Sequence, residues 1–121
     1  MRAQFLLRRG FLVLGLLGTS FPVAAHAILM EGYPAPNGTV PAGTVAIRLR
    51  FNSRIDVGRS RLTLVVPGRG EQRLQIQPGP TPDLMEAETI LAAGGMALHW
   101  QVLAIDGHIT RGIIPFTAIA R

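Results

Sequence analysis

The chain has 121 residues, of which 48% are hydrophobic and 16% charged, and it contains no cysteine. This length allows one domain and excludes a large nucleotide-binding or barrel enzyme, while the hydrophobic fraction excludes a disordered chain. Without cysteine there is neither a disulfide nor a thiolate metal site. The formal net charge of +5 invites a nucleic-acid partner, but three of the twelve arginines precede residue 10. The others are dispersed and nearly balanced by seven acids, so no nucleic-acid binding is expected.

The first 25 residues have the three-part order of a secretory signal peptide. Residues 1–9 carry three positive charges, residues 11–17 form a short apolar run, and small residues lead up to Ala25. The apolar run is too short to span a bilayer comfortably, so the mature chain is not expected to cross a membrane. The pair Arg8-Arg9 fits both the twin-arginine and the general secretory route.

The site of signal cleavage decides which residue heads the mature chain. Small residues at Val23 and Ala25 favour a cut that leaves His26 as the new N-terminus. Ala25 and Ala27 satisfy the same rule, and a cut after Ala27 would discard the histidine. Both alternatives stay open, and the domain is expected to span residues 26–121.

Period-two alternation predicts a chain of short strands in this domain. In residues 44–51, for example, Val45, Ile47, Leu49 and Phe51 alternate with Ala46, Arg48 and Arg50. Similar patterns predict strands over 28–33, 61–66, 72–77, 96–105 and 113–119, whereas 84–91 fits a strand or a short helix equally well. Glycine and proline punctuate them at 67–68, 78–82 and 94–95. About seven strands predict an all-β, immunoglobulin-like antiparallel sandwich with Trp100 as its core anchor.

The chemistry-bearing residues are few, because the chain has only three histidines, His26, His99 and His108. No serine-hydrolase elbow and no glycine-rich phosphate loop is present. In extended backbone Asp106 and His108 would project from one face, and Gly107 would let the chain bend there. Alone, this pair also fits a turn aspartate beside an exposed histidine. His99, next to Trp100 and pointing away from its face, is expected to be structural or exposed.

A histidine at a mature N-terminus changes the interpretation, because it chelates through both its ring and its free amine. With Asp106 and His108, His26 would complete a set of three nitrogens and one oxygen. A nitrogen and oxygen set without sulfur favours Cu(II). The sequence therefore predicts one Cu(II) ion bound by His26, Asp106 and His108.

These residues resemble the CopC copper-resistance family. The resemblance rests on His26-Ala27-Ile28-Leu29 after the signal, Pro34, Trp100, and the spacing of Asp106-Gly107-His108 with Gly112 and Phe116. It implies a periplasmic, cupredoxin-like or immunoglobulin-like β-sandwich that binds copper without catalysis. It also implies the His26 amine and ring, Asp106 and His108 as ligands, and an inner-membrane copper transporter of the CopD type as a partner.

Two features depart from the family pattern. Members often carry an acid after a Phe-Ser pair, where this chain has Phe51-Asn52-Ser53, so that carboxylate is missing. Members with a methionine-rich loop bind Cu(I), but Met30, Met85 and Met96 are scattered and are expected to serve packing.

Two other functions are alternatives to that of a copper-binding protein. In a metal-free interaction module, Asp106 and His108 would merely cap a turn. In a small copper-dependent oxidative enzyme, an N-terminal histidine and a second histidine would hold a catalytic copper. The single Tyr and single Trp argue against the flat aromatic surface that such an enzyme needs.

Overall fold

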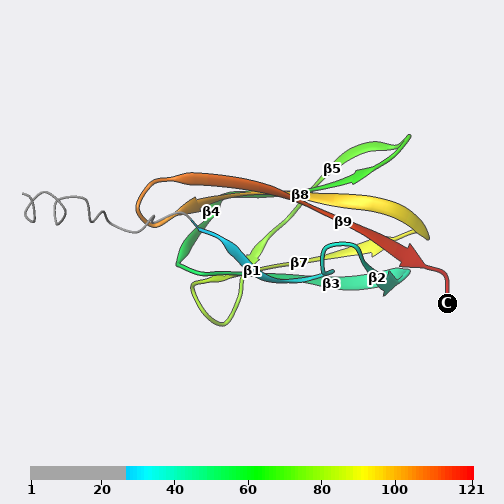
Figure 1. Cartoon of the computed structure of the whole chain (residues 1–121), viewed down its shortest axis with the longest axis horizontal. Helices are drawn as coiled ribbons and strands as arrows, with labels where there is room; N and C mark the ends of the chain where they lie inside the picture. The colour runs from blue at the N-terminus through cyan, green and yellow to red at the C-terminus, as the bar shows by residue number, and fades with distance from the viewer. Residues whose placement is uncertain (1–26) are drawn as a thin grey trace, which may run out of the picture.

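The computed structural model describes residues 27–121, which form nine strands and no helix (Figure 1). The strands are β1 (Leu29–Tyr33), β2 (Gly38–Pro41), β3 (Gly43–Phe51), β4 (Ile55–Val66), β5 (Gly70–Leu74), β6 (Gln77–Pro78), β7 (Leu84–Leu91), β8 (Gly94–Ala104) and β9 (Ile109–Ile119). The signal peptide predicted over residues 1–25 and the proposed ligand His26 lie outside the described residues. The described residues include no helix that could span a membrane.

The strands form two sheets that face each other, as the two layers in Figure 1 show. A four-stranded sheet has the order β1-β3-β7-β6, and a five-stranded sheet has the order β2-β9-β8-β4-β5. All pairings are antiparallel except that of β2 with the end of β9. The all-β sandwich predicted from the alternation of apolar residues is confirmed.

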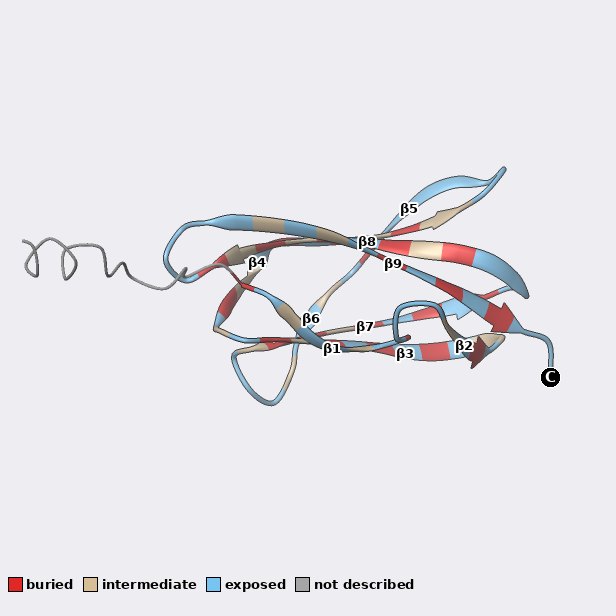
Figure 2. Cartoon of the chain, in the orientation of Figure 1, coloured by how far each residue is buried: buried red, intermediate tan, exposed pale blue. Residues whose placement is uncertain are grey.

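The core lies between the sheets because alternate side chains of each strand point inward. In β3 the predicted inward residues Val45, Ile47, Leu49 and Phe51 are all buried, while Ala46 and Arg48 are exposed. Figure 2 shows buried positions alternating with intermediate or exposed ones along β8 and along the second half of β9. The predicted periodicity therefore identifies the core face of the long strands.

The structure adds strands that the sequence pattern did not reveal. The short strand β2 pairs in parallel with residues 116–119 of β9, a contact that depends on the distant end of the chain. Residues 84–91 form strand β7 and not a helix, because they lie between β3 and β6 in the four-stranded sheet. Burial of Met85 and Leu91 in the core favours the strand over the local helix propensity.

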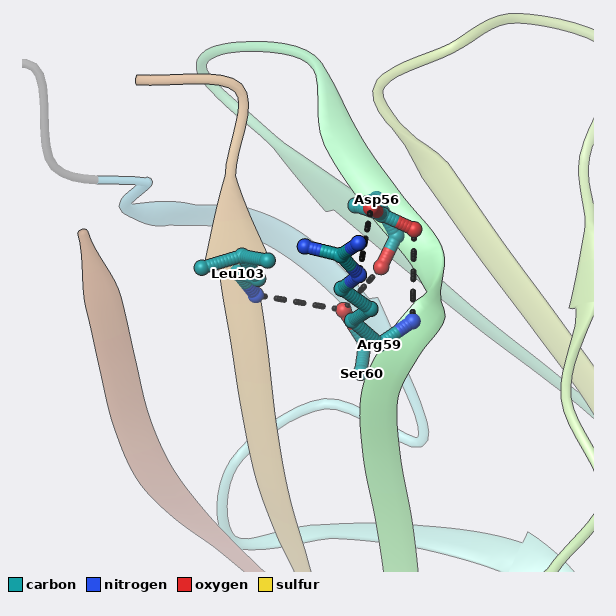
Figure 3. Close-up of polar contacts among 4 residues, drawn as sticks. All are labelled: Asp56, Arg59, Ser60 and Leu103. Atoms are coloured by element: carbon teal, nitrogen blue, oxygen red, sulfur yellow. Dashed lines mark hydrogen bonds and ion pairs between the residues drawn. The ribbon is translucent and has the colours of Figure 1, made fainter. Parts of the chain in front are cut away.

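Strand β4 contains a large bulge opposite β8 (Figure 3). The pairing passes from Asp56 opposite Leu103 to Arg61 opposite Gln101, so four residues of β4 face a single residue of β8. The Ser60 hydroxyl accepts a hydrogen bond from Leu103 N at 3.2 Å and donates one to Asp56 O at 2.7 Å. Ser60 thus gives the Leu103 amide a side-chain partner within the bulge.

Trp100 is the core anchor that the sequence predicted. It is 7% exposed, and its ring meets Phe51 of the opposite sheet edge-on, with centroids 5.1 Å apart. On the neighbouring strand β9, Gly112 lies directly opposite Trp100. A Cβ on Gly112 would lie 2.7 Å from Trp100 Nε1 and closer still to two ring carbons. Glycine at position 112 is therefore what leaves room for the indole.

We expect Gly112→Ala to lower the free energy of unfolding by about 1–3 kcal/mol, because the indole must shift against Phe51 to admit a methyl group. Urea unfolding followed by the fluorescence of Trp100 measures this loss. Gly95→Ala is the matched control, since Gly95 lies on the adjoining strand and has no atom within 4 Å of an added Cβ. Equal losses in the two variants would contradict the overlap with Trp100.

Candidate metal centre

The predicted pair Asp106 and His108 lies on the hairpin that joins β8 to β9. The hairpin closes with Gly107 N donating to Ala104 O at 2.9 Å and Ala104 N donating to His108 O at 2.8 Å. Gly107 has a φ of +92°, a conformation that favours glycine, so it permits the bend as predicted. The backbone is turned here, not extended, so the two side chains meet through the turn and not through strand alternation.

A pair of hydrogen bonds joins the two residues. Asp106 Oδ1 accepts from His108 N at 3.1 Å, the geometry of an aspartate turn, and Asp106 Oδ2 lies 2.7 Å from His108 Nδ1. An ionised carboxylate can only accept, so the shared proton belongs to Nδ1. In the neutral ring this leaves the lone pair on Nε2, the nitrogen that can bind a metal.

The electrostatics of the pair favour an ionised carboxylate. The backbone hydrogen bond from His108, followed by the side-chain bond with it, lowers the pKa of Asp106 below its ordinary value of 3.8. The His108 side chain is 59% exposed, and that of Asp106 is 27% exposed. A negatively charged oxygen and an oriented imidazole are therefore presented at the surface of the hairpin.

The N-terminal segment is held at the same end of the sandwich by Asn52. Ile28 N donates to Asn52 Oδ1 at 2.7 Å, and Asn52 N donates to Ile28 O at 2.9 Å. Ala27 is fully buried in the core cluster. The residue before it, His26, is the third predicted ligand and is not among the described residues.

The connector between β3 and β4, residues 52–54, links this segment to the hairpin. Asn52 bonds Ile28, and two residues later Arg54 O accepts from Ile105 N at 3.3 Å. Figure 1 shows the start of β1 and the β8–β9 hairpin at the same end of the sandwich. Sequence reasoning missed Asn52; an amide residue directly after a strongly alternating strand was the available signal.

Two buried hydroxyls in the described part of the chain have no hydrogen-bond partner, those of Ser53 and Thr110. Ser53 belongs to the same connector, and Thr110 follows His108 by two residues in β9. Buried polar atoms are almost always bonded to protein or to water. Both hydroxyls belong to segments that adjoin the β8–β9 hairpin.

Residues 27–121 contain no group of three or more His, Cys, Asp or Glu side chains that could hold a metal ion. They supply two candidate ligands, Asp106 and His108, so a complete site needs a further donor. His99 is not part of this pair, because it lies in the middle of β8, opposite Thr63 and Ile113 on the neighbouring strands. Its side chain is exposed on the other face of β8 from Trp100, as the sequence predicted. Met85 and Met96 are buried in the core, whereas Met30 is 54% exposed on β1.

Fold and site together define a small β-sandwich protein with a carboxylate–imidazole pair on the terminal hairpin of its larger sheet. The CopC domain model matches residues 29–118, and the chain therefore belongs to the CopC domain family. The family resemblance read from the sequence is confirmed.

Named relatives support the same assignment. The chain is 30% identical over 101 residues to Protein YobA of Escherichia coli K12, covering 78% of this chain and 80% of the relative. The crystal structure of CopC from Methylosinus trichosporium OB3b is similar with a TM-score of 0.70 and 23% identity, covering 79% of this chain and 96% of that one. PcoC, described as a methionine-rich copper resistance protein from Escherichia coli, is similar with a TM-score of 0.64 and 24% identity, covering 79% and 99%. The two solved structures confirm the sandwich fold.

The carboxyl group of Asp106 is expected to titrate below 3.8 in the metal-free protein. Because the folded-state pKa is lowered, the stabilisation it gives is complete above the ordinary pKa and is lost as the pH falls through the lowered value. The His108→Ala variant loses the side-chain hydrogen bond to Asp106 but keeps the one from the backbone amide of residue 108. The pKa of Asp106 should therefore rise only part of the way back to its ordinary value. Carbon NMR of the carboxyl over an acidic pH series measures both values. A value at or above 3.8 in the unaltered protein would contradict the two hydrogen bonds.

Proposed function

We propose that this protein binds one Cu(II) ion in the periplasm and serves copper homeostasis or resistance without catalysing a reaction. The proposed ligands are the amine and ring of His26, the carboxylate of Asp106 and the ring of His108. The observation that carries the proposal is the oriented Asp106–His108 pair at the end of the sandwich where the N-terminal segment is anchored. Membership of the CopC family, and likeness to a copper resistance protein, support it.

The donor chemistry fits Cu(II). Imidazole and amine nitrogens with one carboxylate oxygen suit a tetragonal Cu(II) site, and the absence of cysteine removes the soft thiolate ligand. The bond between Asp106 and His108 Nδ1 directs the ring so that Nε2 is the binding nitrogen. For Asp106 to bind the ion as well, one of its oxygens must turn from His108 toward the metal.

The anchoring of Ala27 limits where the third ligand can lie. Burial of Ala27 and the bonds between Ile28 and Asn52 hold the start of the described chain at this end of the sandwich. Consecutive Cα atoms are 3.8 Å apart, so a ligand at position 26 would be supplied from this end. Anchoring of the following residues would lower the conformational entropy that a metal-binding N-terminus loses. A copper-transporting inner-membrane protein of the CopD type is the proposed partner for delivery.

The test is a Cu(II) titration of the exported protein, with intact mass establishing that His26 heads the chain. Electron paramagnetic resonance should show a tetragonal type 2 centre with nitrogen hyperfine structure. His108→Ala should lower the Cu(II) affinity by roughly ten- to a hundredfold or more. His99→Ala should change the affinity little, because His99 lies in the middle of β8 and not on the hairpin. Equal affinities in the two variants would overturn the proposed site.

A second arm isolates the terminal amine. Prepending one glycine moves the amine away from the His26 ring while keeping all three side chains. The affinity should fall by roughly ten- to a hundredfold, since the fused chelate ring is lost. If the extended protein binds Cu(II) as tightly as the processed one, the N-terminal chelate is wrong.

Asn52 is expected to act as a positioning residue for this site. Asn52→Ala removes the acceptor of the Ile28 amide, so the Cu(II) affinity should fall by about tenfold and the copper hyperfine splitting should change. Asn52→Asp keeps an acceptor oxygen and should restore both. Hydrogen exchange at Ile28 should be fast in the Ala variant and slow in the Asp variant. Unchanged affinity together with fast exchange would show that the anchor does not serve metal binding.

A further inference from the structure

The outer face of the five-stranded sheet carries arginines that neither the core nor the candidate metal centre uses. Arg61 of β4 and Arg111 of β9 lie on either side of Gln101 of β8. Directly opposed residues share a face of the sheet, and Arg111 Nε donates to Gln101 Oε1 at 2.9 Å. Both arginines are exposed, so two guanidinium groups project from one row of this face.

The adjacent row adds an imidazole, a hydroxyl, an apolar side chain and a third arginine. These are His99, Thr63, Ile113 and, from β5, Arg73. A shallow depression of about 440 Å³ is lined by Arg61, Thr63, His99, Gln101, Arg111 and Ile113, together with Trp100 and Gly112. Every polar side chain in this lining can donate a hydrogen bond, and no acid is among them.

The two sheets differ in how their arginines are compensated. On the four-stranded sheet, Arg48 pairs with Glu86 at 3.0 Å and Arg50 pairs with Glu31 at 2.8 Å. Among the described residues, no salt bridge involves the three arginines of the opposite outer face. The acids on or beside that face are Glu71 at the far end of β5, Asp56, which is bonded to Arg59 in the bulge, and Asp106, which is bonded to His108 on the hairpin. Uncompensated positive charge therefore gathers on the five-stranded sheet.

Isoleucines border this charge. Every second residue of β9 from Ile109 to Ile119 is exposed, and Ile109 and Ile113, on either side of Arg111, are 52% and 60% exposed. Ile105, at the hairpin, is 68% exposed. A face that combines exposed isoleucines with arginines has apolar surface to bury and cations to neutralise at the same place.

We propose that this face docks on an anionic phospholipid surface. Guanidinium groups bind phosphate with two parallel hydrogen bonds, and the depression between Arg61 and Arg111 is large enough for a headgroup phosphate. Isoleucine side chains between the arginines would enter the boundary between headgroups and acyl chains. A small soluble anion would use the arginines but leave the isoleucines exposed, which favours the lipid surface as the occupant.

Docking in this orientation places the β8–β9 hairpin at the membrane. Ile105 and Ile109 flank Asp106 and His108 in the chain, so the hairpin that carries them would touch the bilayer through its isoleucines. The inference stands on the charge and apolar pattern of the outer face and does not require that the hairpin binds a metal.

Co-sedimentation with vesicles tests the proposal, using the exported, processed protein because the signal segment is itself apolar. Vesicles of phosphatidylcholine with about one-third phosphatidylglycerol should bind the protein, and pure phosphatidylcholine should bind it weakly. Binding should weaken as salt is raised. The double variant Arg61→Gln/Arg111→Gln should lower the partition coefficient by about 25-fold, about fivefold for each arginine. Adding Ile113→Ser to the double variant should lower the partition coefficient further, by a factor that does not depend on salt because the lost contact is apolar.

Arg48→Gln/Arg50→Gln is the matched control, because it removes the same formal charge from the opposite sheet. It should leave vesicle binding nearly unchanged, and circular dichroism should show that all variants remain folded. Equal losses in the two double variants would overturn the proposal, since net charge alone would then explain the binding. Absence of vesicle binding would also overturn it; if polyglutamate then bound through Arg61 and Arg111, the face would be a site for an acidic protein.

Discussion

The packing of Trp100 between the sheets fixes the register of β8, and the rest of the molecule follows from that register. With Trp100 inward against Phe51, Leu98 and Val102 must also face the core, and His99 and Gln101 must face outward. A slip of one residue would exchange these two faces and bury an imidazole in place of an indole. The neighbouring strand must then present Gly112 to the ring, because any side chain there would overlap it.

The same register sets the geometry of the sandwich end. Residues 94–103 of β8 pair with β9 without a shift in register. This continuous pairing places the turn of the hairpin at residues 105–108. The bulge in β4 interrupts the pairing of β4 with β8, and Ser60 provides a hydrogen-bond partner for the Leu103 amide there. The hairpin therefore extends directly from paired strands, a base that favours a fixed geometry of the side chains it carries.

The connector of residues 52–54 is the second element that organises this end of the sandwich. It leaves β3 after Phe51, anchors the N-terminal segment through Asn52, and reaches the hairpin through Arg54. The N-terminal segment, the connector and the β8–β9 hairpin are thereby hydrogen-bonded to one another at the same end of the sandwich. Ser53, in the same connector, has a buried hydroxyl for which the described residues offer no hydrogen-bond partner.

The sequence by itself determined the fold class, the core faces of the long strands and the identity of the Asp106–His108 pair. These follow from local periodicity and from residue chemistry, both of which can be read along the chain. Strand β2 and the strand state of β7 could not be read in this way, because each depends on pairing with residues far away in the sequence.

The tertiary structure also decided how the pair meets. The sequence predicted side chains aligned along an extended strand, whereas a turn brings the Asp106 carboxylate onto the His108 ring. The contact between Asn52 and Ile28 and the gathering of arginines from three strands on one face likewise depend on which segments the fold brings together. Hydrogen bonds and charges across strands depend on which residues lie opposite one another, and only the folded sheet determines that.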